Sequence, residues 1–155
     1  MNSVYELDWD LLPDHMRFGS SYNEPLRLFR GEKEAKVARG AGLLSLAAEE
    51  GDLRLVYEFG EAVRERNETL MRILRSDHGF HVHRNGRLTP FISASPVKEI
   101  ARRYSRQPDE VLVEFEVPVC RTVIGPHTTC GSDLPGEILV IDRVLPEEII
   151  AVHNF

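Results

Sequence analysis

Apolar residues recur with two different periods along this chain. Between Leu53 and Arg75 they recur three or four positions apart, so most of them fall on one face of a helix. This pattern predicts a long amphipathic packing helix over residues 53–75, with Asp52 as its N-cap. A shorter helix is predicted over residues 43–50, ended by Gly51.

Short apolar runs bounded by turn residues predict strands in most of the second half. These runs are FHVHR (80–84), TPFIS (89–93), EVLVEFEVP (110–118), RTVIG (121–125), EILVID (137–142) and IIAVHNF (149–155). An earlier strand, PLRLFRGE (25–32), is expected to stop at Gly31. A helix over residues 96–105 has Ser95 as its predicted N-cap and Pro96 as its first residue. Helices followed mostly by strands predict an α+β fold rather than alternating β-α-β units.

The composition is that of one globular domain. The chain has 155 residues, of which 42% are hydrophobic and 28% charged. No apolar run approaches the roughly 20 residues of a membrane span. The start, MNSVYELDWD, lacks the positive charge of a secretion signal, so we expect a cytoplasmic protein without a membrane partner. Residues 1–25 are expected to form an irregular arm or short helix leading into a single domain, 1–155.

Charge and cysteine content narrow the possible classes of function. The net charge of −6 disfavours general nucleic-acid binding, which needs many Lys and Arg side chains at phosphates. The run KEIARRYSR (98–106) is nevertheless basic, and is either a solvated face or a path for RNA or DNA. Cys120 and Cys130 are expected to be reduced thiols. The histidines and cysteines lack zinc-site spacing, so no metal is expected.

Polar residues stand at the ends of three predicted strands, where a side chain can face a cleft between sheets. Arg30 follows LRLF, and Glu137 opens EILVI. Ser93 and Ser95 both lie in FISAS. Taken singly, each has a structural explanation as a surface arginine, a helix cap or a solvated carboxylate. Taken together, they supply donors for phosphate, a hydroxyl and a carboxylate.

The order of these residues resembles the Arg-Ser-Glu group of ADP-ribosyltransferases. The stretch HVHRNGRLTPFISAS and the ending GEILVIDRVLPEEIIAV are also similar to members of that superfamily, and the resemblance covers residues 26–155. It implies a split β-sheet core with helices packed on it and NAD lying across the cleft. It also implies an NAD-dependent mono-ADP-ribosyltransferase, toxin- or effector-like, that cleaves the nicotinamide–ribose bond and modifies a protein or nucleic-acid acceptor.

The resemblance also implies roles for particular residues. Glu137 is the candidate for stabilising positive charge that develops on the ribose when the bond breaks. Arg30 is the candidate clamp for the NAD phosphates, and Ser93 for orienting the carboxylate and contacting the ribose. Further candidate contacts to NAD are Ser95, His83, Phe91 and Tyr104. A toxin-like enzyme of this kind implies an antitoxin or immunity protein as a partner.

One position departs from the family pattern. Many members carry Glu or Gln two residues before the glutamate, whereas this chain has Pro135, which leaves the acceptor open; Asp133 or Thr129 are candidate substitutes. Two other functions stay open. One is a non-catalytic binding module on the same scaffold, and the other is a ribonuclease that uses His81, His83 and the basic helix.

Overall fold

The computed structural model describes residues 6–19, 24–76, 82–83, 87–103, 108–126 and 135–154, with the backbone alone at 76, 82–83 and 87–88. The α-helices are α1 (Glu34–Ala38), α2 (Leu46–Glu49), α3 (Arg54–Arg64), α4 (Glu68–Ser76) and α5 (Lys98–Arg103). The longer strands are β1 (Pro25–Lys33), β5 (Phe91–Ala94), β6 (Glu110–Pro118), β7 (Thr122–Ile124), β8 (Ile138–Ile141) and β10 (Ile149–His153). Two-residue strands are β2 (Leu43–Leu44), β3 (Val82–His83), β4 (Arg87–Leu88) and β9 (Arg143–Val144). Short 3₁₀ turns are η1 (Trp9–Leu11), η2 (Asp14–Met16), η5 (Val119–Arg121) and η6 (Pro146–Glu148).

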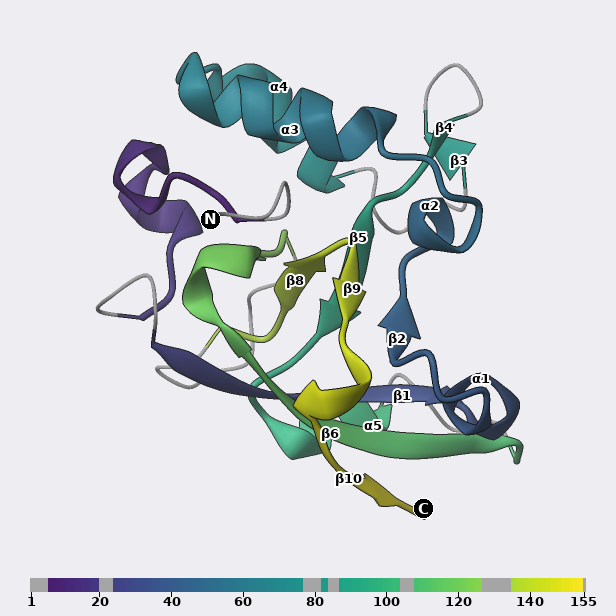
Figure 1. The fold of residues 1–155 in the computed structure, drawn as a ribbon. Coiled ribbons are helices and arrows are strands. Elements are labelled where there is room, and N and C mark those ends of the chain that lie inside the picture. Colours follow the sequence, from purple (N-terminus) through teal and green to yellow (C-terminus); the bar gives the residue numbers. More distant parts are fainter. Residues whose placement is uncertain are drawn as a thin grey trace.

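Two separate three-stranded antiparallel sheets organise the fold. We call β1-β6-β10 the long sheet and β5-β8-β7 the central sheet, after the strand order in each. Helices α3 and α4 lie above the central sheet, and the long sheet crosses below it (Figure 1). Helix α5 packs against β1. The combination of helices with antiparallel sheets confirms the α+β class.

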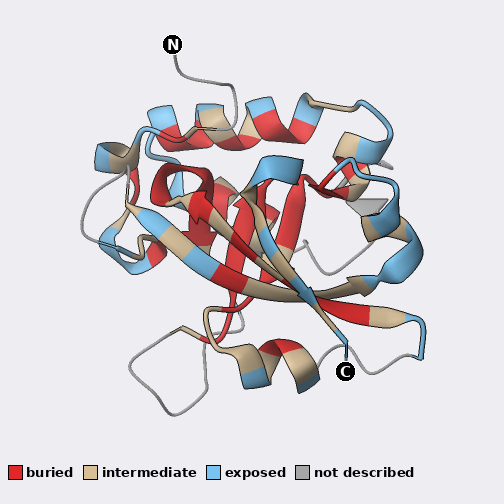
Figure 2. Cartoon of the chain, turned by 60° about the horizontal axis from the view of Figure 1, so that its bottom comes forward, coloured by how far each residue is buried: buried red, intermediate tan, exposed pale blue. Residues whose placement is uncertain are grey.

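The central sheet is buried on both faces. Along β8, Leu139 and Ile141 belong to an apolar cluster shared with α3 and α4, while Ile138 and Val140 belong to a second cluster shared with the long sheet. This alternation follows from the two-residue period of a strand. Figure 2 shows the central strands almost wholly buried. A continuous apolar run such as ILVI is therefore needed to fill both layers.

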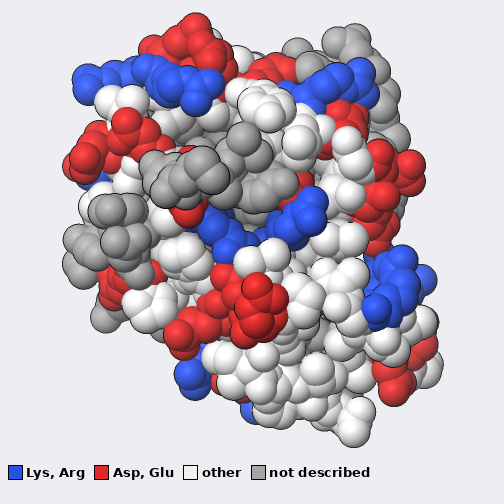
Figure 3. Space-filling view, in the orientation of Figure 1, with Lys and Arg blue, Asp and Glu red and all other residues white. Residues whose placement is uncertain are grey.

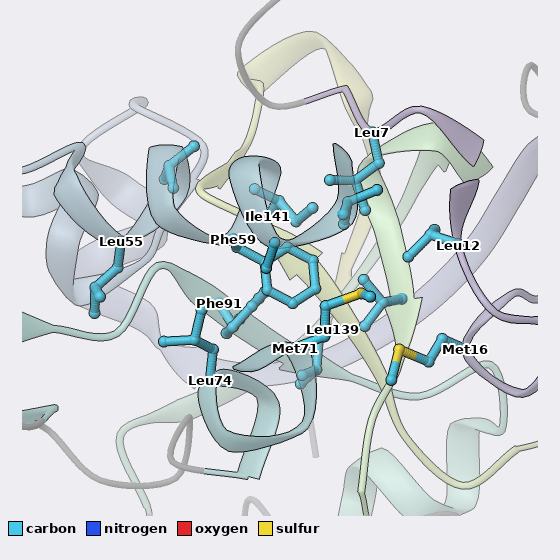
Figure 4. Packing of buried hydrophobic residues seen from close by; sticks show 14 residues of the cluster. Leu7, Leu12, Met16, Leu55, Phe59, Met71, Leu74, Phe91, Leu139 and Ile141 are labelled. Atoms are coloured by element: carbon cyan, nitrogen blue, oxygen red, sulfur yellow. The ribbon is translucent and has the colours of Figure 1, made fainter. Parts of the chain in front are cut away.

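The helix-side cluster packs through large side chains from α3, α4 and the central sheet (Figure 4). Phe59 and Phe91 meet edge to face, with ring centroids 5.1 Å apart and planes at 88°. Leu7, Leu12 and Met16 of the N-terminal arm are buried in the same cluster. The described part of the arm contains two short 3₁₀ turns, and it contributes to the core instead of merely leading into it.

The single long helix predicted over residues 53–75 is wrong, because the chain forms two helices there. Arg66 has a φ of +55°, a left-handed conformation that ends α3. The Asn67 side chain then accepts a hydrogen bond from the Leu70 N–H at 3.1 Å and so starts α4. The prediction of Asp52 as the N-cap is also wrong, because α3 begins at Arg54 and Leu53 is at the cap position. The Asp52 carboxylate nevertheless accepts the Arg54 N–H at 3.0 Å.

Two other predicted boundaries also move. Leu43 and Leu44 pair with β9 instead of opening a helix, and the Ser45 hydroxyl accepts the Ala48 N–H at 3.0 Å to start α2. Strand β1 continues through Gly31, because every residue as far as Lys33 is paired with β6. A glycine within a paired strand therefore did not end it.

Candidate functional site

Arg30 connects the long sheet to the central sheet. It lies two positions after the fully buried Leu28, so its side chain leaves β1 on the face that is turned toward the central sheet. Its Nη1 donates to the Ser93 carbonyl at 2.7 Å, and its Nε donates to Glu32 Oε2 at 3.3 Å. The arginine is therefore held at the end of β5 by two partners.

Ser93 and Glu137 form a direct side-chain pair. The Ser93 hydroxyl donates a hydrogen bond to Glu137 Oε2. The antiparallel register explains the contact, because Ala94 faces Ile138 and so β5 ends where β8 begins. Glu137 is only 6% exposed, in contrast to the solvated carboxylate that a strand-opening glutamate usually provides. The structure thus brings Arg30, Ser93 and Glu137 together at one end of the central sheet.

Gly125, directly after β7, forms one wall of this site. Its N–H donates to the Glu137 carbonyl at 3.0 Å. A Cβ atom at position 125 would lie 2.7 Å from both Cγ and Cδ of Glu137, closer than real contacts allow. A larger residue here would displace the Glu137 side chain, so the close approach of the glutamate to the backbone favours glycine.

Arg75 approaches the same site from the last turn of α4. Its Nη1 donates to the Ile124 carbonyl at 2.6 Å, one residue before Gly125. Burial lowers the pKa of the Arg75 guanidinium, and the negative charge of Glu137 opposes that effect. From the sequence, Arg75 is predicted only as the last residue of a packing helix. Its spacing of four from the buried Met71 was the available signal that it points inward.

Glu32 was also missed by the sequence analysis. Its side chain is 11% exposed and pairs with Arg30 Nε, while its other oxygen accepts the Lys33 N–H at 3.0 Å. Its position two residues after Arg30 was the signal, since alternate residues of a strand share a face.

Ser95 has a structural role different from the predicted N-cap. Its backbone exchanges two hydrogen bonds with Phe29, at 2.8 and 3.0 Å, and so joins the two sheets. Its hydroxyl accepts the Val97 N–H at 3.1 Å, in the turn before α5. The helix begins only at Lys98, so Ser95 and Pro96 lie before it and the N-cap prediction is wrong.

The remaining predicted NAD contacts divide into two groups. Phe91 is 4% exposed and packs against Phe59, so the structure places its ring in the core instead of in a stacking position. The side chain of His83 and the whole of Tyr104 lie outside the described residues. So do His81, a candidate for the ribonuclease alternative, and residues 127–134, which include the possible acceptor contacts Thr129 and Asp133.

Several charged side chains on the described surface form ion pairs, among them Arg64 with Glu61 at 2.6 Å. Arg102 of α5 pairs with Glu99 at 3.3 Å, which favours a solvated face for this part of the basic helix. Figure 3 shows acidic and basic side chains in small neighbouring groups on the face that it presents. Within the described ranges, no group of three or more His, Cys, Asp and Glu could hold a metal ion. None of the helices in that same part of the chain is long and apolar enough to cross a membrane.

The arrangement has a definite chemical capability. A buried carboxylate held by a hydroxyl interacts strongly with positive charge, because little water screens it. Arg30 uses Nε and Nη1 in its two bonds, and its side chain is 31% exposed, so further guanidinium donors are available to an anionic group.

Comparison with protein-family models gives no match to this chain, and comparison with curated proteins also gives none.

Proposed function

We propose that this chain is an NAD-dependent mono-ADP-ribosyltransferase with Glu137 as its essential carboxylate. The main observation behind the proposal is the hydrogen bond from the Ser93 hydroxyl to Glu137. Arg30 donates a second hydrogen bond to the Ser93 carbonyl. Arg30 lies on β1, Ser93 lies on β5 and Glu137 directly precedes β8, which is the order that the family resemblance implies. The presence of two small sheets joined at Phe29 and Ser95 also supports a split-sheet scaffold.

The proposed reaction breaks the bond between ribose C1′ of NAD and the nicotinamide nitrogen. The bonding electron pair leaves with nicotinamide, and positive charge develops on the ribose. The Glu137 carboxylate stabilises that charge, and the Ser93 hydroxyl holds the carboxylate in position. Arg30 binds the phosphate oxygens of NAD. A nucleophilic group of the acceptor, or water, then bonds to C1′ and releases its proton.

The acceptor is a protein or nucleic-acid group in this proposal. The segment 127–136 before Glu137 is the proposed acceptor contact, and Pro135 gives it no hydrogen-bonding side chain at the position where many family members have one. Acceptor choice then rests on other residues of that segment. A toxin- or effector-like role, with an antitoxin or immunity protein as partner, extends the same proposal.

Release of nicotinamide from NAD by the purified protein tests the proposal. We expect release by the unaltered protein and its loss in Glu137→Ala, because Glu137 is the carboxylate that the Ser93 hydroxyl holds among the described residues. Glu147→Ala is the matched control, since Glu147 is an exposed glutamate on η6. Release at an unchanged rate by Glu137→Ala would refute the assigned role of Glu137.

Two other outcomes identify the alternative functions. NAD binding in calorimetry without nicotinamide release indicates a non-catalytic module on this scaffold. RNA cleavage that needs no NAD and disappears in His83→Ala indicates a ribonuclease.

A further inference from the structure

We propose that Arg75 is a positioning residue for Glu137: it fixes the Ile124–Gly125 segment against the glutamate and places a positive charge near that carboxylate. The catalytic meaning of this inference rests on the proposed function. The physical claim concerns only the folded chain and is testable without any substrate.

The first observation is the hydrogen bond from Arg75 to β7. Nη1 of Arg75 donates to the Ile124 carbonyl at 2.6 Å, which ties the C-terminal end of α4 to the end of the central sheet. The partners are 49 positions apart in the chain. The contact therefore depends on tertiary packing, and an arginine donor is stronger than a neutral one.

The second observation is that the fixed segment touches the glutamate. Gly125 directly follows Ile124, donates its N–H to the Glu137 carbonyl at 3.0 Å and packs against the Glu137 side chain. Displacement of this segment would remove one wall beside the carboxylate. Arg75 is therefore connected to Glu137 through the backbone of two adjacent residues, Ile124 and Gly125.

The third observation is electrostatic. Ser93 faces the Glu137 carboxylate from β5 as a hydroxyl donor, and Arg75 attracts it from α4. The residues from β7 to Gly125, TVIG, contain no ionisable side chain. Arg75 thus supplies positive charge to Glu137 from the helix side of the central sheet. A positive charge beside a carboxylate favours its ionised form.

The burial of Arg75 supports a specific role over a chance contact. Its Nε is fully buried and has no hydrogen-bond partner among the described residues, an arrangement that costs stability. Burial also lowers the pKa of the guanidinium. An arginine that lowers the stability of the fold and lies next to a buried glutamate is typical of functional sites.

The experiment is a pH titration of the Glu137 carboxyl carbon by ¹³C NMR, with the signal assigned from its loss in Glu137→Gln. We expect Arg75→Gln to move the titration midpoint to higher pH by about half a pH unit or more. Arg75→Lys, which keeps the charge, should move it by less. Arg72→Gln, which removes an exposed charge from the same helix, is the matched control and should leave it unchanged.

The inference is overturned if Arg75→Gln leaves the midpoint where it is in the unaltered protein, or if Arg75→Lys moves it equally far. If Arg75→Gln does not fold, Arg75→Met is measured in its place, because methionine keeps the apolar part of the arginine side chain. Failure of both to fold makes Arg75 a structural residue and also overturns the inference. The pH dependence of nicotinamide release tests the catalytic consequence. Its acid limb should also move to higher pH in Arg75→Gln. A protein that releases no nicotinamide but shows the NMR shift refutes the proposed function and leaves the inference intact.

Discussion

The two three-stranded sheets of this protein differ in how far their residues are buried. The long sheet has an edge strand, β10, on which Ile150 and Val152 are each 47% exposed. Every residue of β8 in the central sheet is buried, with apolar clusters on both sides. A charged group is therefore easily placed on the long sheet, whereas at the end of the central sheet it needs partners.

This difference explains why the Ser93–Glu137 pair carries more information than the surface ion pairs. A carboxylate taken out of water without hydrogen bonds costs several kcal/mol. Glu137 accepts the Ser93 hydroxyl and lies near the charge of Arg75, which together reduce that cost. Such a paired, buried carboxylate at a strand end is the kind of group that functional sites contain.

The largest expected effect contrasts one apolar residue from each sheet. Leu139→Ala removes a fully buried side chain from the centre of β8 and should lower the free energy of unfolding by about 2–5 kcal/mol. Val152→Ala, at a half-exposed edge position, should change it by less than about 1 kcal/mol. Urea denaturation measures both. Similar losses in the two variants would contradict the distinction between the sheets.

The next effect concerns the backbone approach at Gly125. Gly125→Ala places a methyl group against the Glu137 side chain and should destabilise the protein by about 1–3 kcal/mol. Gly60→Ala is the matched control, because it lies inside α3 and the nearest atom to its new Cβ is 3.7 Å away. It should stabilise by up to about 1 kcal/mol through helix propensity. Thermal unfolding of the two variants checks the opposite signs.

A smaller effect is expected on the solvated part of the long sheet. Arg27 is 55% exposed and pairs with Glu114 and Glu116, each at 3.3 Å. Because water and salt screen exposed pairs, Arg27→Ala should cost only about 0.5 kcal/mol. The loss should shrink further when urea denaturation is repeated in 1 M salt. A loss comparable to that of Leu139→Ala would show that the long sheet depends on this ion pair.

The smallest effect appears only at alkaline pH, next to the central sheet. Burial raises the pKa of the Cys120 thiol, the Glu6 carboxylate adds to this, and Arg121 opposes it. The unfolded chain therefore loses the thiol proton first, so the free energy of unfolding falls as pH rises from about 8.5 toward the raised pKa. Cys120→Ala should flatten that slope, and Cys130→Ala is the control. An unchanged slope in Cys120→Ala would contradict the effect of burial on this thiol.

The sequence predicted the fold where local patterns decide the structure. Strands such as β6 and β8 were found because apolar runs and turn residues mark them directly. The long helix failed because Arg66 adopts a left-handed conformation and Asn67 caps a new helix, and neither feature alters the apolar period. The added pairing of β2 with β9 depends on residues about 100 positions apart, which no local pattern reveals.

The candidate site was predictable to a different extent. Ser93, Glu137 and Arg30 could be selected by residue type and by order along the strands, and the structure brings them together. Arg75 could not be connected to them, because its contact with Ile124 requires α4 to end beside β7. Phe91 is the opposite case. It was predicted to contact NAD because it is aromatic, but its ring packs against Phe59 in the core.

The most direct test of the central claim is a paired measurement on Glu137→Gln, comparing the rate of nicotinamide release from NAD with the urea midpoint. Glutamine has nearly the same shape and still accepts the Ser93 hydroxyl, but it carries no charge. We expect release per folded molecule, with the folded fraction taken from the urea transition, to fall by about 100-fold or more. Release at the rate of the unaltered protein, or loss of folding with no change in rate per folded molecule, would contradict it.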